Sequence, residues 1–158
     1  MALYCHKPAL EGGESLLVDG KKVYDILDNS FPDVLEELSA PGSVAFGGDK
    51  IPLVGSIFNH LPNDNIYIRF RYDNLVYFSP RVLNVIDTFL NVLKANCFSF
   101  QLCENQGYIV KNGQWLHGRK SFIGSREMYR ILLNINDMVP TAKISFGFTP
   151  SRITNKIL

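Results

Sequence analysis

The feature that most constrains the fold is one long amphipathic helix, predicted from Ser79 to Ala95, among many short segments with strand character. Ser79 can cap the helix, and Pro80 suits its first position because a backbone N–H there would have no partner within the helix. The apolar side chains recur at helical spacing and form one face, made of Val82, Leu83, Val85, Ile86, Phe89, Leu90, Val92 and Leu93. Such a face must be buried against a second layer of structure.

Short strands are the main material for that layer. The clearest covers residues 66–72, where Ile66, Ile68, Phe70 and Tyr72 define one face and Tyr67, Arg69 and Arg71 the other. Asn112-Gly113 is a strong signal for a hairpin turn. Two shorter helices are predicted at 20–27 and 32–39, and the other strands at 2–6, 15–19, 98–102, 107–110, 114–116 and 129–135. This pattern predicts the α+β class, a jelly-roll-like sandwich or barrel with helices packed outside.

Composition sets the broad class of protein. The 158 residues suit one domain, and a hydrophobic content of 46% is too high for a disordered chain. Lys and Arg number 16 against 15 Asp and Glu, so we expect neither nucleic acid nor an acidic membrane surface as a partner. No apolar run approaches about 18 residues, which predicts no membrane span.

The N-terminus and the cysteines favour a cytoplasmic location. The first residues show no signal peptide. Cys5, Cys97 and Cys103 are odd in number and include no C-x-x-C pair, which argues against a disulfide scaffold. We expect Cys97 and Cys103 to be buried as small apolar side chains.

The segment that carries chemistry runs from Lys111 to Leu133. It places His117 at the expected end of a strand and Arg126 and Arg130 at the start of the next. Neutral imidazole is the commonest metal ligand, and arginine is best suited to a two-pronged grip on a carboxylate. Taken alone, a histidine near arginines is more often a surface or hydrogen-bonded residue. Trp115 can wall a substrate pocket, although core packing is the commoner role.

Two segments resemble one enzyme family, the iron(II)- and 2-oxoglutarate-dependent oxygenases of the taurine dioxygenase and clavaminate synthase type. Residues 112–119 resemble the family segment Asp-Asn-Arg-x-x-Leu-His-Gly-Arg, with Lys111 in place of the Asp and Gly113 in place of the first Arg. Residues 8–19 resemble its Pro-Ala-x-x-Gly-Gly-Glu-Thr-x-x-x-Asp segment, with Ser15 in place of the Thr. The resemblance spans residues 2–135 and implies an incomplete double-stranded β-helix (jelly roll) with flanking helices.

The resemblance also implies roles for individual residues. His117 corresponds to the second histidine that binds Fe(II). Arg126 and Ser15 correspond to residues that bind 2-oxoglutarate, the cosubstrate. Arg130 would be structural or would contact an anionic substrate, and we group it with Trp115 as a substrate residue. The implied reaction hydroxylates or desaturates a small molecule, such as an amino acid or a natural-product intermediate, while 2-oxoglutarate is decarboxylated to succinate.

One part of the family's metal site is missing from the sequence. Its iron is held by two histidines and a carboxylate, and the first histidine and the carboxylate form a His-x-Asp or His-x-Glu pair. His6 is followed by Lys7 and Pro8, and His60 by Leu61 and Pro62, so neither makes such a pair. We therefore expect residues 1–158 to be a single partial oxygenase domain that is inactive alone.

Three explanations stay open for that gap. The chain can be a fragment, a subunit that self-associates or receives the missing ligands from another chain, or a degenerate descendant. A strand that follows Met1 directly favours the first two. The alternative function is a non-catalytic binding or interaction domain built on the same fold.

Overall fold

The structure is a computed structural model that describes residues 1–47, 51–62, 64–133 and 146–152. Within these residues the three helices are α1 (Gly20–Ser30), α2 (Pro32–Ser39) and α3 (Pro80–Ala95). The strands are β1 (Ala2–Lys7), β2 (Glu11–Gly12), β3 (Ser15–Asp19), β4 (Val44–Phe46), β5 (Leu53–Gly55), β6 (Phe58–His60), β7 (Ile66–Ile68), β8 (Val76–Phe78), β9 (Phe98–Phe100), β10 (Gly107–Ile109), β11 (Trp115–Arg119), β12 (Phe122–Ile123) and β13 (Glu127–Ile131).

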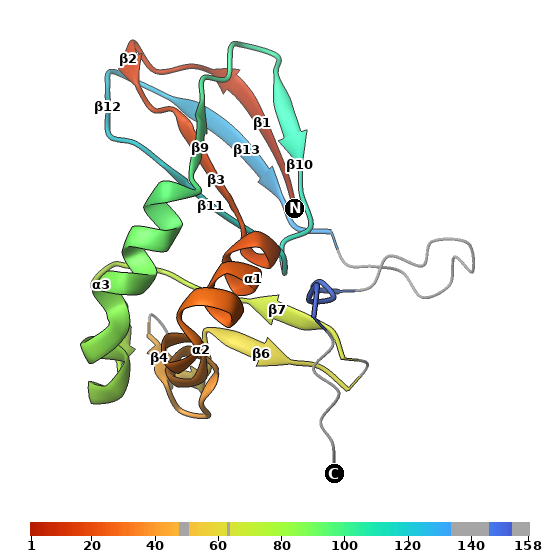
Figure 1. Ribbon diagram of the computed structural model, residues 1–158. Helices are drawn as coiled ribbons and strands as arrows, with labels where there is room; N and C mark the ends of the chain where they lie inside the picture. The colour runs from red at the N-terminus through yellow and green to blue at the C-terminus, as the bar shows by residue number, and fades with distance from the viewer. Residues whose placement is uncertain (48–50, 63, 134–145, 153–158) are drawn as a thin grey trace.

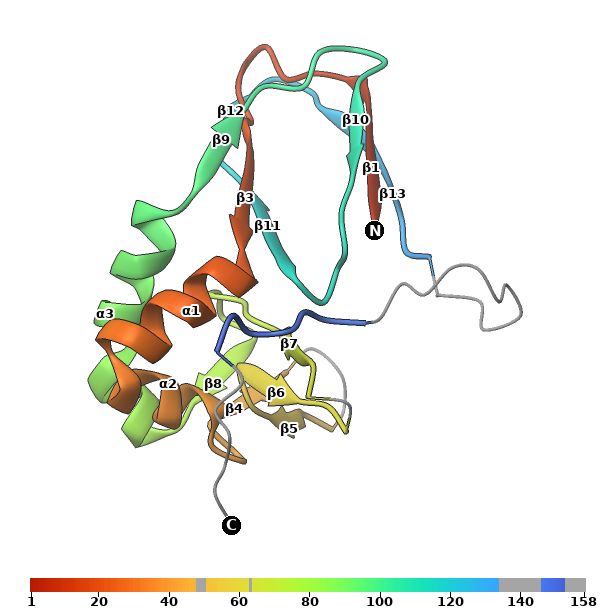
Figure 2. The same cartoon turned by 45° about the vertical axis from the view of Figure 1, so that its right-hand side comes forward.

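Two three-stranded antiparallel sheets form one half of the molecule. One has the order β10-β1-β13 and the other β11-β3-β9. Figure 2 shows them on opposite sides, and the helices and β4 to β8 form the other half (Figures 1 and 2). The smaller sheets are β5-β4-β8, β6-β7 and β12-β2. The predicted α+β class, with antiparallel sheets and flanking helices, is confirmed.

The helices begin where capping chemistry predicts. The Ser79 hydroxyl accepts a hydrogen bond of 3.3 Å from the backbone N–H of Val82 at the start of α3. The Asp19 carboxylate does the same for Lys21 at the start of α1, at 3.0 Å. No helix in the described part of the chain is both long and apolar enough to cross a membrane.

The main core lies in the half of the molecule that the helices and β4 to β8 form. Phe58 and Phe89 are fully buried, and their rings meet edge to face with centroids 6.2 Å apart. The other fully buried apolar side chains in this cluster are Val23, Leu27, Leu38, Val44, Ile57, Ile66 and Val82. Val18 at the end of β3 and Val23 in α1 belong to this core, which therefore fixes the point where the β11-β3-β9 sheet meets the helices.

Residues 146–151 pack against this core. Phe148 is 3% exposed and exchanges two backbone hydrogen bonds with Ile66, at 2.8 and 2.7 Å. Thr149 donates to the Asn65 side chain at 2.8 Å, and Ser151 donates to Asp25 from its backbone at 2.9 Å and from its hydroxyl at 2.6 Å. We call residues 146–151 the C-terminal clasp.

Several sequence-based predictions are corrected by the structure. The prediction of a hairpin at Asn112-Gly113 is wrong. The turn forms, but the strands on its two sides do not pair with each other, because β10 pairs with β1 and β11 pairs with β3. His117 lies inside β11 and not at its end. Cys97 and Cys103 are exposed, and only Cys5 is buried.

The bounds of several predicted strands also change. The strand predicted at 66–72 ends at Ile68, because beyond it the backbone bonds to loops: the Arg69 N–H donates to the Ile57 carbonyl at 2.9 Å. The strand predicted at 129–135 starts earlier, at Glu127, and ends at Ile131, while residues 134–135 lie outside the described residues.

Candidate active site

His117 is placed by the pairing of β11 with β3. In this antiparallel register His117 lies opposite Leu17 and Arg119 opposite Ser15. The next pair of strands sets Ser15 opposite Phe100. Because directly opposed residues share a face of a sheet, His117, Ser15 and Phe100 lie on the same face.

That face looks toward the other sheet. The Phe100 ring meets the ring of Tyr108 on β10 edge to face, with centroids 5.7 Å apart. Tyr108 is opposite Leu3 on β1, and Leu3 is opposite Arg130 on β13, so Tyr108 and Arg130 share the inward face of the second sheet. The register therefore brings His117 and Arg130 to facing surfaces, from sheets that stand opposite each other in Figure 2.

His117 and Arg130 line one cleft, with a volume of about 830 Å³. The imidazole is accessible through this cleft. The surrounding protein still removes part of its hydration, and this burial lowers the pKa of His117. A hydrogen bond with the Trp115 backbone opposes the shift, while the positive charges of Arg130 and the N-terminus add to it. The neutral imidazole that metal binding needs is therefore the favoured form.

A second group of polar side chains surrounds Ser15. Ser15 is 1% exposed, and its hydroxyl lies close enough to the Tyr108 hydroxyl to influence the pKa of that group. Burial raises the pKa of the Tyr108 hydroxyl, and the Arg126 charge and the Ser15 hydroxyl act in the opposite direction. Arg126 therefore lies close enough to act on the pair electrostatically. Two hydroxyls and a guanidinium in a half-buried position suit a carboxylate.

Gly13 explains how Arg126 approaches this group. Its φ is +75°, and a Cβ there would lie 3.3 Å from the Arg126 Cδ and 3.2 Å from the Phe122 Cβ. Any larger side chain at position 13 would be strained and would crowd Arg126. The Gly-Gly pair therefore allows the β2–β3 turn to pack against the segment that carries the arginine.

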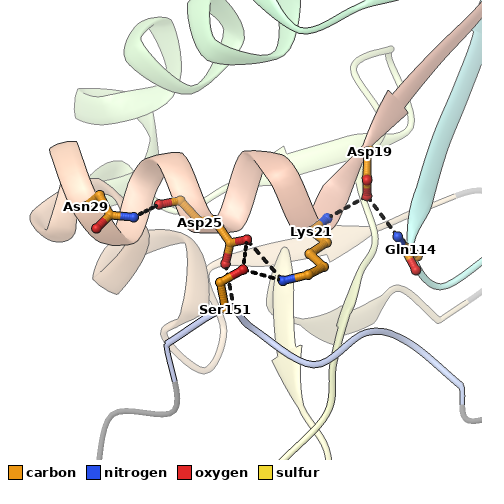
Figure 3. Close-up of polar contacts among 6 residues, drawn as sticks. All are labelled: Asp19, Lys21, Asp25, Asn29, Gln114 and Ser151. Atoms are coloured by element: carbon orange, nitrogen blue, oxygen red, sulfur yellow. Dashed lines mark hydrogen bonds and ion pairs between the residues drawn. The ribbon is translucent and has the colours of Figure 1, made fainter.

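A hydrogen-bond network holds the far end of the β3–β11 pair (Figure 3). The Asp19 carboxylate, while it caps α1, also accepts a 3.0 Å hydrogen bond from the Gln114 side chain. The Gly20 N–H donates to the Gln114 backbone carbonyl at 2.8 Å. The start of α1 is thus tied to the residue just before β11, three positions from His117.

The clasp also reaches the cleft. Phe146 lines it, and a Cβ on Gly113 would lie 2.8 Å from the tip of the Phe146 ring. The space that the arginine of the resembling segment would need at position 113 is therefore occupied here by an aromatic ring. This gives a structural reason for one of the two departures from that segment. Nothing in the structure explains Lys111.

The predicted site residues fall into two neighbouring groups. His117, Arg130 and Trp115 line the cleft, whereas Ser15 and Arg126 lie with Tyr108. Tyr108 was not predicted from the sequence, where a lone tyrosine in a short strand carries no signal. Its position on the same face as Arg130 follows from the strand register, which the sequence alone does not give.

The described residues do not complete a metal site. No group of three or more His, Cys, Asp or Glu side chains gathers among them. The His6 ring lies 5.6 Å from the ring of Tyr129, which shares the outward face of its sheet with Tyr4. His60 lies on β6, in the other half of the molecule. His117 is thus the one histidine of the described residues in the cleft.

Comparison with known proteins gives a family and a fold. The model of the family described as taurine catabolism dioxygenase TauD, TfdA family, matches residues 1–132. No curated protein matches.

Similar solved structures include asparagine oxygenase in complex with Fe(II), 2S,3S-3-hydroxyasparagine and succinate, with 15% identity, a TM-score of 0.61, and 78% of this chain and 40% of that chain covered. The non-heme iron oxygenase OrfP in complex with Fe and alpha-ketoglutaric acid has 13% identity, a TM-score of 0.57, and coverages of 80% and 42%. OrfP with Fe, succinate and (3S)-hydroxy-L-Arg has 12% identity, a TM-score of 0.57, and coverages of 80% and 45%. The chain spans less than half the length of each of these structures.

Proposed function

The chain belongs to the taurine catabolism dioxygenase TauD, TfdA family, and we propose that it forms the C-terminal part of the catalytic domain of an Fe(II)- and 2-oxoglutarate-dependent oxygenase. The proposed reaction is the hydroxylation or desaturation of a small molecule. The observation that carries the proposal is the meeting of two distant segments. His117 lies on the strand that pairs with β3, and Ser15 on β3 and Arg126 both act on the hydroxyl of Tyr108.

We assign the group around Arg126 to 2-oxoglutarate. The guanidinium and the hydroxyls of Ser15 and Tyr108 would hold the carboxylate at the end of the molecule that does not react. A charged donor and two neutral donors in a partly buried site give stronger hydrogen bonds than the same groups in water. Their role is to bind and orient the cosubstrate and to exclude water from it.

We assign His117 as one ligand of Fe(II). Its lowered pKa keeps the ring neutral, and its place inside β11 fixes the ring direction. One histidine does not fit a complete iron site, and no further ligand group gathers in the described residues. We therefore propose that the chain alone is inactive, and that a His-x-Asp or His-x-Glu segment must be supplied by preceding sequence or by a partner chain.

The outward face of the β10-β1-β13 sheet supports a partner for the chain. Ile109, Ile131 and Tyr129 on this face are 78%, 57% and 50% exposed. Apolar side chains gathered on one face of a sheet favour association. We propose that this face is covered either by the segment that carries the missing ligands or by a second copy of the chain. If sedimentation shows that the chain stays monomeric at high concentration, a second copy does not cover this face.

For the substrate we propose an amino acid or a related small natural-product intermediate. Asparagine oxygenase binds hydroxyasparagine and OrfP binds hydroxyarginine in the solved structures that share this fold. Arg130 and Trp115, which line the cleft beside His117, are the proposed substrate contacts. Arg130 suits an anionic group, and the Trp115 ring suits the apolar part of the molecule.

An anaerobic titration tests the assignment of His117. The protein is extended with a His-x-Asp or His-x-Glu segment, and Fe(II) and 2-oxoglutarate are added without oxygen. The visible metal-to-ligand charge-transfer band should appear, should vanish in His117→Ala, and should persist in the control His60→Ala, whose histidine lies on β6. Normal iron binding with Ala at position 117 would refute the ligand assignment.

A second candidate function follows from the missing ligands. The absence of a three-residue metal group among the described residues favours a non-catalytic binding domain that retains the anion-binding groups. Such a domain would bind 2-oxoglutarate or a similar carboxylate through Arg126 with an affinity that Fe(II) does not change. If the chain extended with a His-x-Asp or His-x-Glu segment binds 2-oxoglutarate more tightly when Fe(II) is present, this alternative is excluded.

A further inference from the structure

The wall of the cleft opposite His117 carries positive charge that the proposed reaction does not use. Arg69 and Arg71 come from the segment that follows β7, and both line the same cleft as His117 and Arg130. The backbone N–H of Arg69 donates to the Ile57 carbonyl at 2.9 Å, so this segment is fixed to the core.

The two arginines differ in how their charge is balanced. Arg71 donates to the Asp73 carboxylate twice, from Nε at 3.0 Å and from a terminal nitrogen at 2.6 Å. The Asp73 carboxylate also accepts from the Leu75 N–H at 3.0 Å, so it is held in place beside Arg71. This pair is close to neutral, and Asp73 is fully engaged within it.

Arg69 is held by a ring instead of a carboxylate. Its guanidinium carbon lies 4.3 Å from the centroid of the Phe46 ring, a cation–π contact that orients the group without neutralising it. Within the described residues, no ion pair forms at Arg69 or at Arg130. Two uncompensated guanidinium groups therefore line one cleft, with a neutral imidazole beside them.

The same cleft also carries aromatic side chains. Tyr67 and Phe146 pack with centroids 5.3 Å apart, and Trp115 lines the same cleft. A volume of about 830 Å³ accommodates a small molecule, since ligand pockets in proteins measure roughly 300–1,000 Å³. Two guanidinium groups and aromatic side chains in one cleft match a small molecule with two anionic groups and an apolar part.

We propose that Arg69 forms a second anion subsite in this cleft, so that the substrate is a small molecule with two anionic groups, one held by Arg130 and the other by Arg69. Phe46 positions the Arg69 guanidinium, and the aromatic side chains bind the part of the molecule between the two anions. The inference rests on the proposed function, because it takes Arg130 as the first substrate contact. Acidic amino acids and related diacids belong to this substrate class.

The test compares two ligands of nearly equal shape. L-glutamate and L-glutamine are titrated by calorimetry into chains that carry Arg126→Gln, which removes the group that would otherwise bind a diacid in the way proposed for 2-oxoglutarate. A charged hydrogen bond that only glutamate forms should give about tenfold tighter binding of glutamate. Arg69→Gln should reduce this ratio to near one. The control Arg81→Gln removes a guanidinium that is 76% exposed on α3, outside the cleft, and should leave the ratio unchanged.

Each outcome has a defined meaning. Three results would overturn the second subsite: a ratio near one with Arg69 intact, a ratio that survives Arg69→Gln, or the binding of neither amino acid. If the chain with Arg126 intact still binds 2-oxoglutarate, the proposed function stands in each case. A chain that binds no 2-oxoglutarate, with Arg126→Gln no different from wild type, would refute the proposed function itself. Circular dichroism of Arg69→Gln guards against a folding defect, and Arg69→Lys should keep part of the ratio because it keeps the charge.

Discussion

Replacement of Phe148 by alanine tests whether the C-terminal clasp is part of the core. The ring is 3% exposed and meets Tyr24 edge to face, with centroids 6.0 Å apart. A buried phenylalanine contributes about 150–250 Å² of apolar surface, and Phe→Ala changes in cores cost about 3–5 kcal/mol. Because the clasp ends near the surface and can relax into the cavity, we expect a loss near the lower limit, about 3 kcal/mol.

The assay is urea unfolding followed by fluorescence and circular dichroism. A domain of this size is stable by about 5–15 kcal/mol, so the loss should lower the midpoint clearly while the slope stays unchanged. Phe146→Ala is the matched control, because that ring is 48% exposed and its loss should cost less than about 1 kcal/mol. If Phe148→Ala costs no more than Phe146→Ala, the clasp is not packed on the core, and the placement of Phe146 in the cleft wall loses its basis.

Three further predictions concern single positions. Burial should hold the pKa of His117 below its usual value of about 6.5. Between the folded and the unfolded pKa the unfolded state then binds more protons, so the free energy of unfolding should fall as the pH decreases through that window. An NMR titration that places the pKa of His117 at or above 6.5 would contradict this. Asp19→Ala removes the cap of α1 and the Gln114 contact and should cost about 1–2 kcal/mol in urea unfolding, and a neutral result would mean that the network in Figure 3 does not stabilise the fold. Gly147→Ala places a Cβ against the Ile66 carbonyl at a φ of +78° and should cost at least about 1 kcal/mol more than Gly42→Ala, which has a φ of +74° and no atom within 4 Å of its Cβ; equal losses in thermal unfolding would refute the clash.

The elements that the sequence predicted well are those with local chemical markers. Ser79 and Pro80 mark the start of α3, Pro32 marks α2, and both helices begin within one residue of the predicted position. The strand at Ser15–Asp19 was predicted with its observed bounds, because a glycine turn precedes it and a helix cap follows it. In each of these places the information lies within a few residues of the boundary.

The features that could not be predicted depend on contacts between distant residues. Asn112-Gly113 favours a hairpin locally, but the neighbouring strands gain more by pairing with β1 and β3, which are far away in sequence. The approach of Tyr108 to Ser15 depends on two strand registers and on the packing of Phe100. No pattern within a short window carries that information.

The residues of the site also show what the fold can and cannot supply on its own. His117 and Arg130 belong to sheets that share no strand pair, so their distance depends on contacts between the sheets, such as that of Phe100 with Tyr108. The groups that we propose to bind anions are each built from side chains of this chain. The proposed metal site is not complete among the described residues, where a single imidazole lies in the cleft. Carboxylate binding should therefore be an intrinsic property of these residues, whereas metal binding depends on whatever segment completes the cleft.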